Sequence, residues 1–254
     1  MKDKPVRNQI KNHVVEIVGP AGSGKSTLAI ELSKIDKRTI ISPVPNLHQI
    51  RQLPFFAINC LRNTPNLVSF LLSEKYTRPS LSQIVWMVTL TGWHQLLRRA
   101  KAAGKILLLD QGPIFIMTDL SEFGPDCFRS EYMQKWWASS YEQWANTIDL
   151  VVWLDAPVSV LINRINSRTK QHIVKNKSPN EISNFLSMSR QALSQTMPKL
   201  LDFNDSLRIL HFDTSQISPM RIAPRIFSAL GLDEEIKNAD LPEDLSWGIE
   251  SKRN

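Results

Sequence analysis

The stretch EIVGPAGSGKSTL (Glu16–Leu28) decides the fold of this chain. Its glycine-rich part, from Gly19 to Ser26, fits the pattern G-x-x-x-x-G-K-[ST]. A short apolar and β-branched run, HVVEIV (residues 13–18), precedes it, and a helix-forming stretch follows it. A strand, a glycine-rich turn and a helix in this order are the context in which the pattern binds phosphate. The sequence therefore predicts a phosphate-binding loop.

The pattern also predicts how this loop would hold a nucleotide. Glycines let the backbone curl so that N–H groups point inward at phosphate oxygens, and the helix N-terminus adds partial positive charge. We expect Lys25 to reach the β- and γ-phosphates of ATP, the Ser26 hydroxyl to ligate Mg²⁺, and Thr27 to contact the α-phosphate. The other predicted nucleotide-binding positions of the loop are Gly19, Ala21, Gly22, Ser23 and Gly24. The expected cofactors are ATP and Mg²⁺.

Length and composition suit one folded domain. The chain has 254 residues, 42% of them apolar, which suffices for an α/β domain with insertions or with a small appendage. We expect this domain to span residues 13–231, after a basic N-terminal extension (1–12) and before an acidic C-terminal tail (232–254).

The cysteines and the N-terminus indicate a cellular location. Cys60 and Cys127 are isolated and lack metal-ligand spacing, which favours a reducing compartment and apolar packing for both. Residues 1–12 lack the apolar core of a secretory signal, and no apolar run is long enough to span a bilayer. We therefore expect a cytoplasmic protein with no membrane partner.

The chain is basic, with a formal net charge of +7. This charge suits either nucleic acid or a cleft that handles two polyphosphates. A basic stripe interleaved with exposed aromatic residues, the usual footprint of strand binding, does not occur in the sequence. Small phosphorylated ligands are therefore favoured over nucleic acid, and the sequence leaves a homodimer open.

Apolar runs and helical spacing alternate along the rest of the chain. Further strands are predicted at residues 37–42, 105–109, 150–154 and 207–212. Helices are predicted at residues 66–75, 80–103, 128–146, 157–168, 179–202 and 219–230, with another around 47–58 that is interrupted at Pro54. This alternation predicts a parallel sheet with helices on both faces.

An acidic residue, Asp110, follows the buried run KILLL (105–109). The carboxyl end of a strand lies on the side of a parallel sheet where ligands bind. Asp110 could there hold a water on Mg²⁺ or accept a proton from an attacking hydroxyl. The alternative is an aspartate that only caps the next turn. We favour the functional role, because a strand and a carboxylate together are what a Mg²⁺–ATP site requires.

Two later segments complete the candidate site. Arg164 and Arg168 are four residues apart on a predicted helix, and with the polar stretch after them they could form a lid (about 158–178) that brings positive charge to the transferred phosphoryl group. A solvated basic face is the alternative. After the last strand, Thr214 and Ser215 could face the adenine, or could only cap the next helix.

The order of these motifs resembles the nucleoside and nucleotide kinase group of P-loop proteins, with thymidylate kinases and deoxynucleoside kinases the most similar. The features are the phosphate-binding loop, a strand ending in D-x-G, an L-D-x-P helix with R-x-x-x-R, and a final D-T-S strand. The resemblance implies a three-layer P-loop NTPase fold with a five-stranded parallel core. It also implies a helical lid that carries Arg164 and Arg168, and Mg²⁺–ATP as donor.

Two positions depart from the pattern of that group. Relatives often carry a carboxylate or arginine beside a proline after the second strand, where this chain has Ser42. They also carry an arginine after the acid of the third strand, where this chain has Gln111. Both departures concern the acceptor and its phosphate, so they put a nucleoside acceptor in doubt while leaving the kinase chemistry intact.

The acceptor pocket is expected between the second and third strands, at about residues 42–104. Candidate contacts there include Trp86, Trp93 and His94, although Trp86 and Trp93 fall near core positions. We therefore expect a P-loop kinase that transfers the γ-phosphoryl group of ATP to a nucleoside or nucleoside monophosphate. Alternatives are a kinase for a sugar or other non-nucleotide hydroxyl, and an ATP-binding regulatory module.

Overall fold

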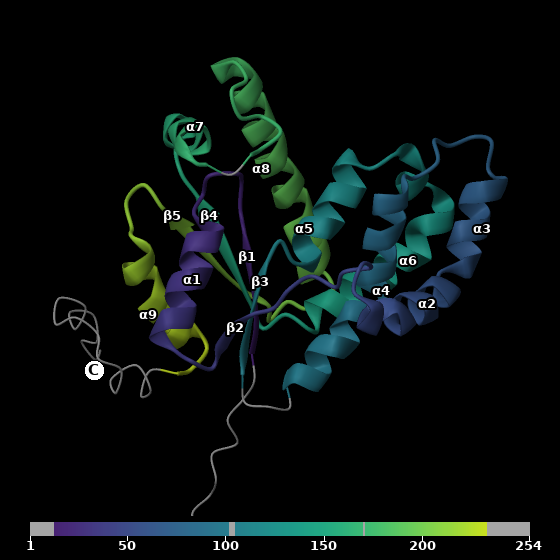
Figure 1. The fold of residues 1–254 in the computed structure, drawn as a ribbon, viewed down its shortest axis with the longest axis horizontal. Coiled ribbons are helices and arrows are strands. Elements are labelled where there is room, and N and C mark those ends of the chain that lie inside the picture. Colours follow the sequence, from purple (N-terminus) through teal and green to yellow (C-terminus); the bar gives the residue numbers. More distant parts are fainter. Residues whose placement is uncertain (1–12, 102–104, 170, 233–254) are drawn as a thin grey trace, which may run out of the picture.

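The computed structural model describes residues 13–101, 105–169 and 171–232. Within these ranges the chain forms an α/β fold, a parallel sheet surrounded by helices (Figure 1). The sheet has five strands in the order β2-β3-β1-β4-β5. The strands are β1 (His13–Val18), β2 (Thr39–Ile41), β3 (Ile106–Asp110), β4 (Leu150–Asp155) and β5 (Arg208–Asp213). All five predicted strands are confirmed. The predicted N-terminal extension and nearly all of the acidic tail lie outside the described residues.

Helices connect and cover these strands. The α-helices are α1 (Lys25–Ile35), α2 (Leu53–Arg62), α3 (Thr64–Leu72), α4 (Leu81–Lys101), α5 (Pro113–Thr118), α6 (Gln134–Ala145), α7 (Val158–Ser167), α8 (Pro179–Leu201) and α9 (Pro219–Ala229). Short 3-10 turns lie at Ile50–Gln52, Asp126–Arg129 and Glu131–Met133, and a π-helical turn at Asp119–Phe123 continues α5.

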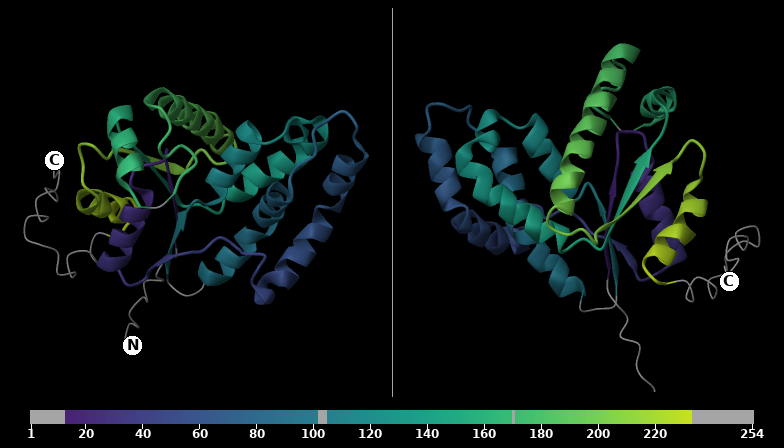
Figure 2. Two further views of the ribbon diagram at one scale, coloured as in Figure 1. Left: turned by 45° about the horizontal axis from the view of Figure 1, so that its top comes forward. Right: turned by 180° about the vertical axis from the view of Figure 1, so that it is seen from behind.

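The predicted three-layer arrangement is confirmed by how β1 packs. Val15 and Ile17 lie in one apolar cluster with residues of α1 and α9, whereas Val14 and Val18 lie in the cluster on the opposite face. Side chains of a strand alternate between faces, so β1 is buried on both sides. Figures 1 and 2 show α1 and α9 on one face of the sheet and α4, α5 and α6 on the other.

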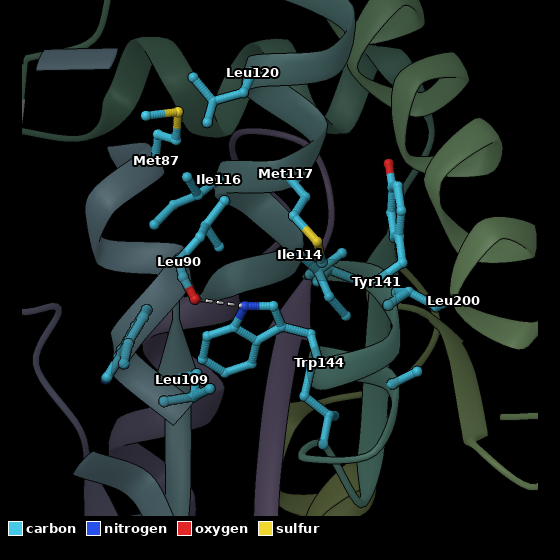
Figure 3. Close-up of a cluster of buried hydrophobic side chains, with 14 of the residues drawn as sticks. Met87, Leu90, Leu109, Ile114, Ile116, Met117, Leu120, Tyr141, Trp144 and Leu200 are labelled. Carbon is cyan, nitrogen blue, oxygen red and sulfur yellow. Dashed lines mark hydrogen bonds between the residues drawn. The ribbon is translucent and has the colours of Figure 1, made fainter. Parts of the chain in front are cut away.

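Tryptophan packing anchors the larger of the two cores. Trp144 of α6 is fully buried among residues of α4, α5 and α8, and its indole N–H donates to the Leu90 carbonyl at 3.2 Å (Figure 3). Trp93 meets it edge to face at a ring distance of 5.9 Å. A buried indole needs such an acceptor, because an unpaired N–H in apolar surroundings is costly.

The lid packs on the body through a third, smaller apolar cluster. Leu161 and Ile165 of α7 meet Ile182 and Leu186 of α8, with Ala21 of the phosphate-binding loop packed against them. Figure 1 shows α7 and one end of α8 beyond the carboxyl ends of the strands. α7, which lies in the predicted lid (about 158–178), and α8 after it therefore border the loop.

Several sequence-based expectations differ from the structure in detail. The helix predicted at residues 128–146 is α6, which begins only at Gln134. Pro54 lies in the first turn of α2, where its missing N–H costs nothing, and does not interrupt a helix. α7 ends at Ser167, so Arg168 lies past its C-terminus with extended backbone. Cys127 is buried as expected, but Cys60 is exposed. In the ranges that the structure describes, no helix is long and apolar enough to cross a membrane.

Candidate active site

The phosphate-binding loop leaves β1 and turns tightly into α1. Gly19, Gly22 and Gly24 have φ angles of 141°, 83° and 94°, in the left-handed region that favours glycine. Gly19 also lies against β4, where a Cβ atom would come within 2.0 Å of the Leu154 carbonyl oxygen. The loop therefore takes its shape from glycines, and β4 holds it from one side.

Lys25 begins α1 and turns its ammonium group back into the loop. Its Nζ donates to the carbonyl oxygens of Gly19 at 2.8 Å and Pro20 at 3.0 Å. Burial lowers the pKa of Lys25 to about 8; the charge of Asp110 opposes this change and that of Arg168 adds to it. A polyphosphate placed here would restore the favourable surroundings that burial removes.

Ser23 adds a hydroxyl inside the loop. Its Oγ is buried and has no hydrogen-bond partner among the described residues, and its own N–H bonds to the Pro20 carbonyl at 3.3 Å. A buried polar atom without a partner is unusual in a native structure. An oxygen-rich ligand in the loop would satisfy this hydroxyl.

Ser26 and Asp110 meet although 84 residues separate them. The Ser26 hydroxyl donates to Asp110 Oδ2 at 2.5 Å, because α1 and the end of β3 share the carboxyl edge of the sheet. Thr27 is exposed beside Ser26. These are hard oxygen donors, and Mg²⁺ commonly takes one or two protein oxygens and completes its shell with phosphates and water. The residues present therefore fit a Mg²⁺ ion bound with a nucleotide.

Arg164 of α7 contacts both the phosphate-binding loop and the loop between β5 and α9. Its guanidinium donates to Thr214 Oγ1 at 2.8 Å, to the Thr214 carbonyl at 2.9 Å and to the Gly22 carbonyl at 3.4 Å. Thr214 in turn donates from its N–H to the Asp155 carbonyl at 2.8 Å. Ser215 folds onto Asp213 through its N–H and hydroxyl. Arg164 thus connects α7, the β5–α9 loop and the phosphate-binding loop.

Arg168 lies close to Lys25. Burial lowers the pKa values of both Lys25 and His172, and the charge of Arg168 lowers them further. The Arg168 Nε is buried and finds no hydrogen-bond partner within the described ranges, and the Arg168 carbonyl accepts a bond from the Lys175 ammonium. An anion bound here would relieve the repulsion between the two cations and pair the free donor.

The structure adds an ion pair that sequence reasoning missed. Arg190 of α8 binds the Asp155 carboxylate through Nε at 2.8 Å and Nη2 at 2.9 Å, and donates to the Ala156 carbonyl at 2.6 Å. Asp155 ends β4 next to the loop, and its position after an apolar strand was a usable signal. Arg190 lies within a long helix, and its spacing gives no indication of its partner.

Glu16 is a second residue that the sequence analysis did not single out. Its side chain is fully buried, on the face of β1 that α5 covers, and accepts the N–H groups of Ile114 at 3.0 Å and Phe115 at 3.1 Å. Burial raises the pKa of Glu16 to about 8; the two N–H bonds oppose this change and the charge of Asp110 adds to it. A carboxyl in the middle of an otherwise apolar strand was the available signal.

The predicted acceptor region (about 42–104) contains α2, α3 and α4, and α5 follows it after β3. Trp93 and His94 are buried in the core, whereas Trp86 is half-buried and packs edge to face on the more exposed Phe115, at a ring distance of 6.1 Å. Gln111 is exposed after Asp110, with a φ of 61° that is uncommon outside glycine. Strained backbone of this kind is concentrated at functional sites.

This chain is similar to solved structures at a distant level. No protein-family model and no curated protein sequence matches this chain. A deoxyadenosine kinase from M. mycoides with bound dATP has 17% sequence identity and a TM-score of 0.47, covering 86% of this chain and 99% of that chain. A thymidylate kinase from Candida albicans has 14% identity and a TM-score of 0.49, covering 89% of this chain and 94% of that chain.

The fold of this chain is established by its own geometry: the strand order, the glycine-rich turn after β1 and the helix that begins at Lys25. The chain has an α/β three-layer P-loop fold.

Proposed function

We propose that this protein is a Mg²⁺–ATP-dependent kinase that transfers the γ-phosphoryl group to a small acceptor, with a nucleoside or nucleoside monophosphate as the favoured class. One observation carries the proposal. The cations of Lys25 and Arg168 lie together beside the paired oxygens of Ser26 and Asp110, at the carboxyl edge of the sheet. Phosphoryl transfer depends on this combination of positive charge and metal-holding oxygen.

Each residue has a role in this proposal. The loop amides from Gly19 onward and the Lys25 ammonium hold the phosphates, and Arg168 supplies charge to the transferred group. Ser26 and Asp110 would hold Mg²⁺, which would supply positive charge to neutralise the phosphate oxygens. The acceptor oxygen attacks the γ-phosphorus, the bond to the bridging oxygen of ADP breaks, and the hydroxyl proton of an alcohol acceptor leaves to water. Arg164 and Thr214 would border the base.

The test is ADP release from Mg²⁺–ATP across nucleosides, nucleoside monophosphates, sugars and aminoglycosides. We expect one acceptor class to stimulate release, and Lys25→Ala to abolish the stimulation. Lys34→Ala is the matched control, because Lys34 lies on the same helix and forms only an exposed ion pair with Glu31. Equal stimulation of wild type and Lys25→Ala, or ATP binding with no stimulation by any acceptor, would contradict the proposal. The second result would favour a regulatory module.

A second candidate keeps the chemistry and changes the acceptor to a sugar or other non-nucleotide hydroxyl. The uncharged residues at two acceptor-side positions, Ser42 and Gln111, favour it, since neither offers the charge that would meet an acceptor phosphate. The same panel separates the two candidates. Stimulation by sugars and not by nucleosides or monophosphates would select the second.

A further inference from the structure

Glu16 is a buried carboxyl whose partners belong to another element. It lies on β1, yet both of its oxygens accept backbone N–H groups from the first turn of α5, 98 and 99 residues later. The N-cap of α5, Gly112, provides no side-chain cap, and Pro113 has no N–H. The N–H groups of Ile114 and Phe115, which have no acceptor within α5, therefore donate to the Glu16 carboxyl of β1.

The contact between Glu16 and the turn is tight. A Cβ atom on Gly112 would come within 2.6 Å of the Glu16 carboxyl carbon, so only glycine leaves room for the carboxyl group. Gln111, the residue before it, has its backbone in the left-handed region. Such a conformation in a residue with a side chain persists when its surroundings hold it in place.

The same turn carries Asp110. From Asp110 at the end of β3, only Gln111 and Gly112 lead to the first residue of α5. A displacement of the start of α5 would therefore also move the Asp110 carboxylate. This carboxylate accepts a hydrogen bond from the Ser26 hydroxyl. Small displacements matter at a metal ligand, because groups behind the ligands set their orientation.

We propose that Glu16 is a positioning residue for the Mg²⁺–nucleotide site: by binding the first turn of α5, it holds the Asp110–Gly112 turn so that Asp110 faces Ser26. The inference rests on the proposed Mg²⁺–ATP site. In this role Glu16 supports metal binding through Asp110 and does not itself contact the nucleotide.

The test compares binding of a fluorescent ATP analogue with Mg²⁺ and in EDTA. In Glu16→Gln the side-chain NH₂ replaces one of the two accepting oxygens and faces a backbone N–H of α5. One hydrogen bond is then lost, and we expect the turn to shift. We expect the apparent Mg²⁺ affinity of the nucleotide complex to fall roughly tenfold or more, as for other groups behind metal ligands. Affinity in EDTA should change by less than about twofold. Glu142→Gln, at an exposed position of α6, is the control.

Gly112→Ala provides an independent variant if Glu16→Gln folds poorly. Its Cβ would push against the Glu16 carboxyl, so the same selective loss of Mg²⁺ affinity is expected. In a Glu16→Ala background the group that this Cβ meets is absent, and Gly112→Ala should then add little further loss. Non-additivity of this kind is the sign of direct coupling.

The outcomes separate this inference from the proposed function. Equal losses with Mg²⁺ and in EDTA, or unchanged Mg²⁺ affinity in both Glu16→Gln and Gly112→Ala, would overturn the positioning role and leave the kinase proposal standing. Nucleotide binding by wild type that is independent of Mg²⁺ would overturn the metal site and the inference together. The result does not depend on which acceptor the protein uses.

Discussion

Lys25 and Arg168 bring two positive charges to one end of the phosphate-binding loop. The charge of Arg168 lowers the pKa of Lys25, and the Arg168 Nε is buried without a partner in the described part of the chain. An anion between the two cations would relieve their repulsion and pair the free donor. These single-residue features support the proposal that the loop binds a polyphosphate.

Arg168→Met should weaken binding of ATP much more than binding of adenosine, which has no phosphates. Losing a hydrogen bond to a charged group costs about 1.5–3 kcal/mol, so we expect the affinity for ATP to fall about 10- to 100-fold. Calorimetric titration with both ligands measures this difference, with the exposed Lys177→Met as control. Similar losses for ATP and adenosine would show that Arg168 only supports the fold.

Glu16 should give the free energy of unfolding a measurable dependence on pH. Its folded pKa is raised to about 8 from an ordinary value of 4.5, so between these values the folded state holds a proton that the unfolded state releases. Stability from this group is therefore present below pH 4.5 and is lost as pH rises towards 8, by at most about 1.4 kcal/mol per pH unit.

Urea unfolding of wild type and Glu16→Gln at pH 5.5 and 7.5 checks this prediction. The neutral amide cannot titrate, so the stability of wild type relative to the variant should fall between the two pH values. A constant difference would mean that Glu16 ionises in the folded protein near its ordinary pKa.

At the scale of elements, the start of α8 is set by local chemistry. The Ser178 hydroxyl accepts the Glu181 N–H, and the Glu181 carboxylate accepts the Ser178 N–H at 3.0 Å, which forms a capping box. Hydrogen bonds with Ser178 lower the pKa of the Glu181 carboxyl. α8 also carries Arg190, so this cap fixes the start of the helix that reaches Asp155.

Ser178→Ala should lower the free energy of unfolding by about 1 kcal/mol, because the first N–H groups of α8 lose an acceptor. Ser194→Ala in the body of the same helix is the matched control, since the Ser194 hydroxyl only donates to the Gln191 carbonyl within the helix. Chemical denaturation of the three proteins measures the difference. An equal effect of the two substitutions would contradict a capping role.

At the scale of the whole molecule, the candidate site joins parts of the chain that are far apart in sequence. The phosphate-binding loop, the end of β3, the lid and the β5–α9 loop each contribute a residue, and Arg164 already joins three of these four parts. A ligand that contacts all of them would oppose unfolding of the entire domain, because it binds the folded state only.

Mg²⁺–ATP should therefore raise the free energy of unfolding by about 2.7 kcal/mol when present at 100 times its dissociation constant. Thermal unfolding with and without the nucleotide measures this stabilisation. Lys25→Ala should lose it at the same ligand concentration, whereas Lys34→Ala should keep it. Stabilisation of Lys25→Ala equal to that of wild type would contradict nucleotide binding in the loop.

Strand positions and the phosphate-binding loop could be predicted from sequence because they depend on short-range patterns. HVVEIV and LVVWL are continuous apolar runs, and the glycines of the loop have the φ angles that the motif requires. The end of α7 was predicted one residue too late, since nothing in the run INSRTK marks the last helical turn strongly. Arg168 consequently lies off the helix that carries Arg164.

Local periodicity and glycine conformation were enough to predict the parallel α/β architecture, the loop after β1 and the place of Asp110 at a strand end. The sequence already assigned Ser26 and Asp110 to one metal site, and the structure brings them into contact. The contacts of Arg190 with Asp155 and of Glu16 with the start of α5 are indicated by no pattern in the sequence and are seen only in the folded chain. These contacts depend on the strand order, which places β1 between β3 and β4. No local pattern encodes that order, since it arises from packing of the whole sheet.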